Sequence, residues 1–92
     1  MIIRIMGEGQ YEVADEAAAA MNAHDDEVAA AVAAGDEETF RSALHAMLSE
    51  LRASGARLPD DSLVSSDVVL PAEDATIEEV RDLLGAEGLL PG

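Results

Sequence analysis

The chain of 92 residues contains 20 Asp plus Glu against 5 Arg and no Lys, so its formal net charge is −15. This charge excludes an extended basic surface, and we expect neither nucleic acid nor anionic lipid as a direct partner. The absence of cysteine excludes disulfides, thiolate catalysis and cysteine-ligated zinc. The length predicts one domain over residues 1–92 with a modest margin of stability.

The beginning of the chain predicts a β-hairpin. Positions 2–6 are β-branched or long apolar residues around one arginine, and a glycine-containing connection leads to Tyr11 and Val13. Alternation along a strand places Ile3 and Ile5 on the same face. Because an isolated hairpin is not stable in water, we expect other elements to cover it.

Two helices joined by a tight connection are predicted next. Residues 14–34 contain no Gly or Pro and are dominated by Ala, which is typical of a helix. We expect Gly35 to end this helix in a left-handed conformation and Asp36 to cap the next helix. The second helix is expected over 37–54 and to end at Gly55. Its apolar residues recur at helical spacing and predict the main core face: Phe40, Leu44, Met47, Leu48 and Leu51.

The rest of the chain predicts a loop, a short strand and a short helix. Val68–Leu70 predicts a third strand, and Leu63–Val64 is a further apolar run. Thr76 and Glu79 have the spacing of a capping box, at the start of a helix predicted to reach Leu84. The predicted fold is an α+β single domain, in which an N-terminal β-hairpin and a short third strand pack on a helical hairpin and a short C-terminal helix.

No segment has the length or composition of a membrane anchor. The longest apolar runs fall well below the roughly 18 residues that a membrane-spanning helix needs. The opening apolar run is also too short for the core of a signal peptide. We therefore expect a cytoplasmic protein without direct membrane insertion. Leu89 and Leu90 lie in a tail rich in Gly and Pro, where they either pack against the domain or contact a partner.

The sequence contains no recognisable catalytic motif. None of its serines lies in a nucleophile-elbow pattern with glycines on both sides. His24 and His45 lack the spacing that would bring two histidines to one metal ion. The segment 7–9 lacks the third glycine and the lysine of a phosphate-binding loop. We expect no enzymatic activity, no cofactor and no metal site.

Acidic residues are concentrated between Arg4 and Arg41, where ten Asp or Glu occur without a basic residue. One interpretation is a docking surface for a basic partner, since opposite potentials steer association. The other interpretation is a solvated helix face that keeps an alanine-rich protein soluble. The candidate partner-binding residues are Asp25, Asp26, Glu27, Leu89 and Leu90.

Several segments match one family together. They are the opening MIIRIMGEGQY, the hinge AGDE, the stretch LPDD, and the closing SDVVLP with the segments Thr76 to Leu84 and GLLPG at 88–92. Over its full length the chain resembles the phage-shock-protein-A-associated domain family, PspAA. The family's own contact residues cannot be transferred onto this sequence, so the candidate residues above come from charge and hydropathy.

The resemblance implies a non-enzymatic accessory protein of the phage shock (envelope stress) response. Such a protein would bind phage shock protein A, a coiled-coil protein that lies on stressed membranes, and modulate its assembly or signalling. It would be recruited to the inner face of the membrane through that partner, and homo-oligomerisation stays open. The alternative is an acidic decoy or inhibitor that occupies a basic site on an enzyme or a nucleic-acid-binding protein.

Overall fold

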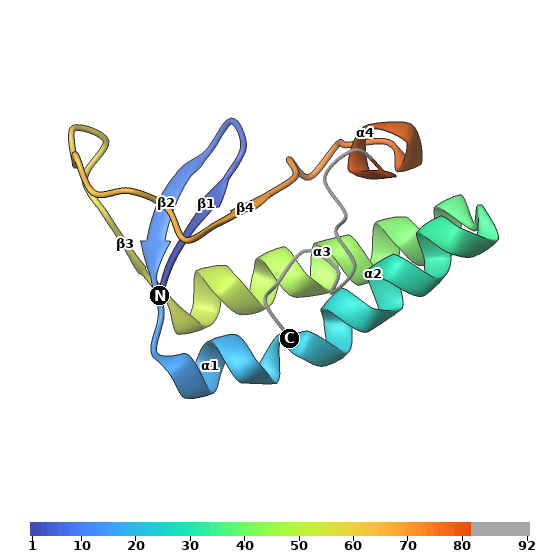
Figure 1. Ribbon diagram of the computed structural model, residues 1–92, viewed down its shortest axis with the longest axis horizontal. Coiled ribbons are helices and arrows are strands. Elements are labelled where there is room, and N and C mark those ends of the chain that lie inside the picture. Colours follow the sequence, from blue (N-terminus) through green and yellow to red (C-terminus); the bar gives the residue numbers. More distant parts are fainter. Residues whose placement is uncertain (82–92) are drawn as a thin grey trace.

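A computed structural model describes residues 1–81 and shows a four-stranded sheet packed on a layer of helices (Figure 1). The prediction of an α+β fold is confirmed. The elements in chain order are β1 (Ile2–Ile5), β2 (Gly9–Glu12), α1 (Asp15–Ala20), α2 (Asn22–Ala34), α3 (Glu37–Ser54), β3 (Ala56–Arg57), β4 (Val68–Leu70) and α4 (Ile77–Arg81).

The sheet has the strand order β3-β2-β1-β4. β1 and β2 form the predicted antiparallel hairpin, and the predicted third strand is present as β4, which runs parallel to β1. The sequence pattern does not predict β3, because its two residues are too few to show alternation. They become a strand by pairing with β2. The apolar run Leu63–Val64 lies between β3 and β4 and belongs to no strand.

The predicted first helix is divided at Met21 into α1 and α2, which corrects the expectation of one continuous helix. The Met21 N–H donates to the carbonyl oxygen of Ala18 at 3.1 Å, a bond typical of a tightened final turn. The Met21 side chain is fully buried. Neighbouring residues of α1 are Ala or acidic, so this turn places the largest apolar side chain of the segment in the core.

The connection between α2 and α3 has the predicted geometry. Gly35 adopts φ 69°, the left-handed conformation that ends a helix. One carboxylate oxygen of Asp36 accepts the Thr39 N–H at 3.1 Å, and the other accepts the Thr39 hydroxyl at 2.7 Å. These bonds, the hydroxyl first, lower the pKa of Asp36 below its ordinary value. α3 then spans the predicted range.

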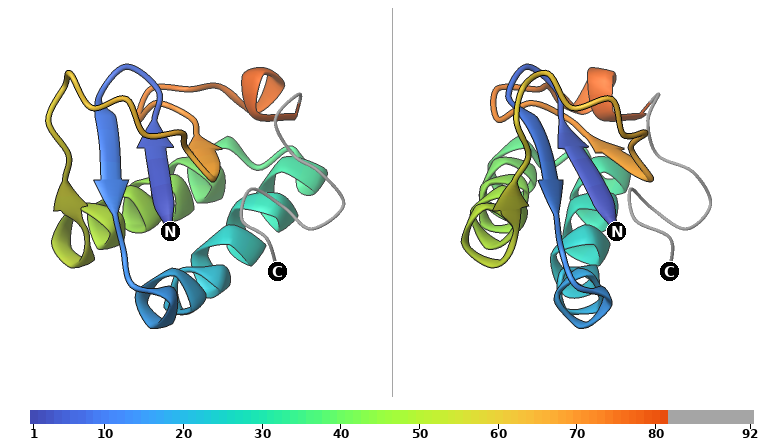
Figure 2. Two further views of the ribbon diagram at one scale, coloured as in Figure 1. Left: turned by 60° about the vertical axis from the view of Figure 1, so that its left-hand side comes forward. Right: turned by 90° about the vertical axis from the view of Figure 1, so that its left-hand side faces the viewer.

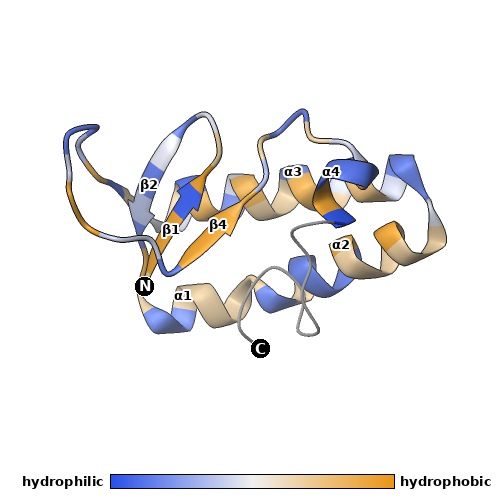
Figure 3. Ribbon diagram, turned by 45° about the horizontal axis from the view of Figure 1, so that its top comes forward, coloured by the Kyte–Doolittle hydropathy of each residue, from blue (hydrophilic) through white to orange (hydrophobic). Residues whose placement is uncertain are grey.

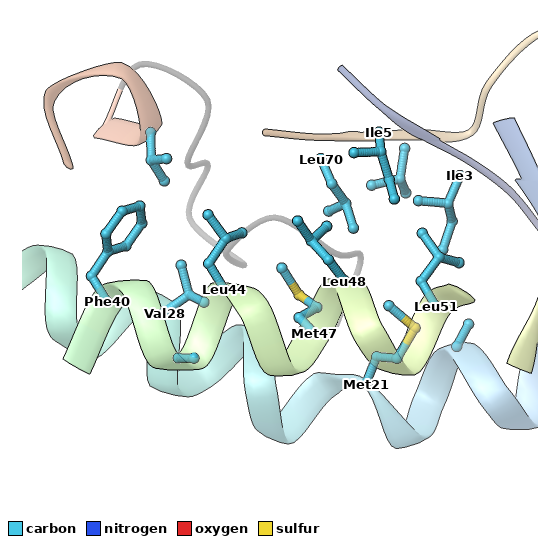
Figure 4. Packing of buried hydrophobic residues seen from close by; sticks show 14 of the residues in the cluster. Ile3, Ile5, Met21, Val28, Phe40, Leu44, Met47, Leu48, Leu51 and Leu70 are labelled. Carbon is cyan, nitrogen blue, oxygen red and sulfur yellow. The ribbon is translucent and has the colours of Figure 1, made fainter. Parts of the chain in front are cut away.

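The predicted apolar face of α3 lies at the centre of the core (Figure 4). Its members, none more than 1 % exposed, are Phe40, Leu44, Met47, Leu48 and Leu51. Ile3, Ile5 and Leu70 point toward this face from the sheet, and Val28 packs on it from α2 (Figure 4). α3 therefore joins the sheet above it to α2 beside it, and the predicted core is confirmed.

Gly55 ends α3 for a different reason than expected. Its φ of −95° and ψ of 160° are extended, so the left-handed stop is not present. A Cβ built at Gly55 would lie 2.9 Å from the Leu51 carbonyl oxygen and 2.9 Å from Cγ1 of Val13. Glycine is needed here because helix and hairpin approach each other too closely for a side chain.

The predicted capping residue at the start of α4 is Thr76, and Glu79 bonds its hydroxyl where a full capping box would bond its backbone N–H. The Glu79 N–H donates to Thr76 Oγ1 at 3.3 Å, and the Thr76 hydroxyl donates to Glu79 Oε1 at 3.2 Å. The predicted extension of this helix to Leu84, and the tail that contains Leu89 and Leu90, lie outside the described residues. Within residues 1–81, none of the helices combines the length and apolar character that crossing a bilayer requires.

Candidate partner-binding surfaces

The structure separates the three acidic residues predicted as a docking site. Asp26 and Glu27 are exposed on α2, whereas Asp25 is only 2 % exposed. Consecutive residues of an α-helix point about 100° apart, so three in a row cannot share one exposed face. Asp25 is therefore buried in the folded chain, and its assignment as a contact residue stays a prediction. Asp26 and Glu27 remain candidate contact residues.

Other exposed acidic residues on the helices have a local structural role. Asp15 and Glu16 lie in the first turn of α1, and the first turn of α3 likewise begins with two glutamates. Negative charge in the first turn of a helix is stabilised by the free N–H groups and the macrodipole. Asp26 and Glu27 lie beyond the first turn of α2, where this effect has faded. The helix end therefore does not explain their charge.

A cluster of polar side chains around Glu8 joins the hairpin tip to α3. Arg52, in the last turn of α3, donates from Nη2 to Glu8 Oε1 at 2.6 Å and from Nε to Glu8 Oε2 at 3.1 Å. The Tyr11 hydroxyl donates to Glu8 Oε2 at 2.5 Å, and Arg57 donates to the Glu8 carbonyl oxygen at 2.7 Å. The two hydrogen bonds from Arg52 to the Glu8 carboxylate fix both the position and the orientation of the hairpin tip.

The hydrogen bonds shift the pKa values of both acids in the cluster. The Arg52 guanidinium, followed by the Tyr11 hydroxyl, lowers the pKa of Glu8 from 4.5 to about 2. The Glu8 carboxylate in turn raises the pKa of Tyr11 above its ordinary value, because an ionised phenol could not donate to it. Sequence reasoning missed this cluster, since Glu8 and Arg52 are 44 positions apart and neither belongs to a local motif.

We expect the Glu8 cluster to make stability depend on pH in the acid range. The folded state holds Glu8 ionised down to about pH 2, whereas the unfolded chain takes up the proton near 4.5. The contribution of ionised Glu8 to the free energy of unfolding is therefore complete above pH 4.5 and is lost as the pH falls toward 2. Urea unfolding at pH 7, 4 and 3 should show a larger loss for the wild type than for Glu8→Gln. Parallel curves for the two proteins would contradict the assigned pKa. The difference between the two stability curves isolates Glu8, because the other carboxylates are the same in both proteins.

A shallow hollow of about 420 Å³ lies beside this cluster. Its charged lining comes from Glu8, Arg52, Glu73 and Asp74. Arg52 is already paired with Glu8 and, through Nη1, with Glu73 at 3.4 Å. Its positive charge is thus neutralised inside the cluster, and among residues 1–81 no other basic side chain lines the hollow to bind an anionic ligand. Within residues 1–81, no three His, Cys, Asp or Glu side chains are grouped to hold a metal ion.

The face of the sheet opposite the helices is only partly covered (Figure 2). The connection of residues 58–67, here called the strap, crosses this face over β2. Gln10, on β2, donates from Nε2 to the Val64 carbonyl oxygen at 2.9 Å and to Ser66 Oγ at 2.8 Å. This contact leaves Gln10 only 5 % exposed. Because β3 and β4 are the two edges of the sheet, the strap also passes the start of β1, where the Asp67 N–H donates to the Ile2 carbonyl oxygen at 2.8 Å. Arg4 on β1 and Val69 on β4 stay exposed.

The accessible part of this face, here called the outer sheet face, includes Arg4 on β1 and Val69 on β4, which lie opposite each other. Met6 lies in the turn after β1, where it lines a hollow with Pro71 and Ala72. Met6 is 47 % exposed and Val69 is 42 % exposed. Figure 3 shows hydrophobic residues along β1 and β4, with a hydrophilic stretch in β1. The predicted common face of Ile3 and Ile5 is the buried one, and Arg4 between them is exposed, as alternation along a strand requires.

Comparison with known proteins identifies the family. A family model described as PspA-Associated protein, PspAA, matches residues 1–92. Searches of curated proteins and of solved structures returned no match. The match includes the hairpin, the acidic helices and the sheet described above. PspAA is an accessory family and is not known as an enzyme family. The chain belongs to the PspA-associated family, and this membership links it to the phage shock system.

Proposed function

We propose that this chain, acting as a single domain over residues 1–92, is a non-enzymatic accessory protein that binds phage shock protein A and modulates its assembly or signalling. The observation that carries the proposal is the match of the PspAA family model to residues 1–92. The match covers the whole of the fold described above, and the family is an accessory family. The function proposed is therefore recognition of a partner protein.

The charge of the chain supports indirect recruitment to the membrane. A net charge of −15 disfavours contact with anionic lipid and with nucleic acid. We propose that the protein is cytoplasmic and reaches the inner face of the membrane through phage shock protein A. In this arrangement the membrane contact is made by the partner, and the acidic chain contributes protein recognition.

Asp26 and Glu27 are the acidic residues that we assign to this recognition. They are exposed on α2, and residues 15–34 contain no Lys or Arg to neutralise them. A negative surface of this kind accelerates association with a basic partner and weakens as salt screens it. Leu89 and Leu90 are proposed as further contacts on apolar character alone.

The first experiment is size exclusion with light scattering on the purified chain, alone and mixed with purified phage shock protein A, at low and high salt. A shared peak of defined stoichiometry supports the proposal. Separate peaks at both salt concentrations, with the chain shown to be folded by circular dichroism, contradict it. The sample without partner also reports whether the chain forms a homo-oligomer.

Reversing two charges on α2 should slow association. For Asp26→Lys with Glu27→Lys, we expect an association rate for phage shock protein A about tenfold lower at low salt, with a flatter salt dependence. Stopped-flow or surface plasmon resonance measures both quantities. Asp25 is left unchanged because a lysine at this buried position would destabilise the fold. Unchanged kinetics in the double variant would remove Asp26 and Glu27 from the interface.

A matched control separates a local contact from a change in total charge. Asp74→Lys with Glu78→Lys changes the net charge by the same amount at exposed positions outside α1 and α2. If both double variants slow association equally, the effect comes from the total charge alone. Weak, salt-sensitive binding to several unrelated basic proteins would favour the acidic decoy or inhibitor instead.

A further inference from the structure

Three of the four large hydrophobic side chains that are exposed in residues 1–81 belong to the strap or to the outer sheet face beside it. They are Leu63 and Val64 of the strap and Val69 of β4, with exposed fractions of 98 %, 49 % and 42 %. The fourth, Met6, lies in the turn after β1. A single exposed apolar residue is ordinary on a protein surface, whereas a group of them marks an interaction site. The described helices cover only the other face of the sheet (Figure 2).

The strap presents Leu63 on a backbone that is already held in place. In the turn before it, the Ser62 N–H donates to the Pro59 carbonyl oxygen at 3.0 Å. After it, the buried Gln10 amide donates to the Val64 carbonyl oxygen at 2.9 Å. Because the backbone is ordered before any contact forms, little conformational entropy is lost when Leu63 is covered.

The strap and the outer sheet face carry opposite charges. Arg4 is exposed next to Val69, and within residues 1–81 it makes no hydrogen bond or ion pair. On the strap, Asp61 is exposed two positions before Leu63 and also makes none with the residues that the structure describes. One chain therefore carries an acidic, apolar loop and a basic, apolar strip of sheet, which are complementary in charge.

These two surfaces lie side by side on the same face of the sheet. The strap passes over β2 at Gln10, Gln10 is directly opposite Arg4 on β1, and Arg4 is opposite Val69 on β4. Neighbouring strands are about 4.8 Å apart, so β2 and β4 are separated by roughly 10 Å. If a second copy faces the first across a two-fold axis, each strap meets the outer sheet face of the other copy. Every contact then occurs twice, as in other isologous interfaces.

We propose that two copies of this chain associate face to face, with Leu63 of each copy packed on Val69 of the other and Asp61 of each paired with Arg4 of the other. The fold and the charge of both partners are those described above, so the inference does not rest on the proposed function. The net charge of −15 on each copy opposes association at low salt. Near an ionic strength of about 0.15 M the Debye length is about 8 Å, so distant acidic residues are screened while groups in contact still attract.

Sedimentation equilibrium of the purified chain over a wide range of concentrations measures the association. We expect a weak dimer, because so few side chains cover less than the roughly 800 Å² per partner of a standard interface. Raising the ionic strength from about 0.01 M to about 0.15 M should strengthen it. Leu63→Ser should raise the dissociation constant at least about tenfold. Because Leu63 is 98 % exposed, its melting temperature as a monomer should not change.

A charge exchange tests the pairing of Arg4 with Asp61. Asp61→Arg should weaken the dimer at least about tenfold, even though it makes the net charge less negative, and Arg4→Asp should do the same. The variant with both substitutions restores opposite charges and should return to within about threefold of the wild-type dissociation constant. Asp26→Arg, exposed on α2, changes the charge as Asp61→Arg does and should not weaken the dimer. Thermal melts confirm that each variant is folded.

The outcomes separate this inference from the proposed function. A wild-type chain that stays monomeric up to about 1 mM would overturn the dimer and leave the binding of phage shock protein A untouched. A dimer that is insensitive to Leu63→Ser and to both single charge reversals would use another surface, such as the edge of β4, and would overturn the assignment. If the double variant associates no better than the single ones, the pairing of Arg4 with Asp61 is wrong.

Discussion

Replacing Leu48 by Ala is expected to lower the free energy of unfolding by roughly 2 to 5 kcal/mol. Leu48 is 0 % exposed and lies on α3 beneath the sheet (Figure 4). The substitution removes buried methyl groups and leaves a cavity that the surrounding helix and strands can fill only in part. Because small domains hold only about 5 to 15 kcal/mol in total, the loss would be a large fraction of the stability.

Urea unfolding followed by circular dichroism measures this loss. Ser49→Ala is the matched control, because it lies next to Leu48 on the exposed side of the same helix. We expect its effect to stay within about 0.5 kcal/mol. A Leu48→Ala protein as stable as this control would show that the face of α3 is not the centre of the core.

The second large effect is expected at Gly55. Gly55→Ala should cost about 1 to 3 kcal/mol, because the new methyl group has to displace packed atoms. The position of that methyl group lies 2.9 Å from the Leu51 carbonyl oxygen, a backbone atom within α3, and 2.9 Å from Val13 Cγ1. Either the end of α3 or the segment between β2 and α1, which contains Val13, has to move.

A double-mutant cycle identifies the source of the strain at Gly55. In a Val13→Ala background, Cγ1 is absent and Gly55→Ala should cost less than in the wild type. Ser54→Ala, one residue earlier and exposed, serves as the control for the position at the helix end. Equal costs of Gly55→Ala in both backgrounds would mean that the Val13 contact is not responsible.

The helices were the most predictable part of the fold. α3 has the predicted bounds because its apolar residues follow the helical period and Asp36 caps its first turn. These signals are local, since they depend on residues three or four positions apart. The break at Met21 has no such signal, because an alanine-rich segment is equally compatible with a straight helix. It is explained only by the burial of Met21 in the assembled core.

The sheet was predicted in part. The hairpin follows from alternation and a glycine-containing turn, and Gly7 adopts the positive φ of 80° that such a turn accommodates. The parallel pairing of β4 with β1 joins segments more than sixty residues apart, so no short pattern can predict it. β3 depends in the same way on its distant partner β2.

For the candidate contact residues, the sequence likewise indicated the charge, and the tertiary structure decided which side chains are exposed. Composition alone indicates an acidic chain, but it cannot tell that Asp25 is buried while Asp26 and Glu27 are exposed. This difference depends on which side of α2 meets the core. The pairing of Glu8 with Arg52 likewise becomes visible only when the hairpin tip lies against the end of α3.

Local order, the α+β class, the main core face and the strong negative charge thus follow from residue types and their spacing, because each rests on neighbours in the chain. The PspAA resemblance also came from the sequence. Strand order, the buried side of α2 and the Glu8 cluster depend on contacts between segments far apart in the chain. Such contacts form only when the whole core is assembled, so they could be found only in the folded structure.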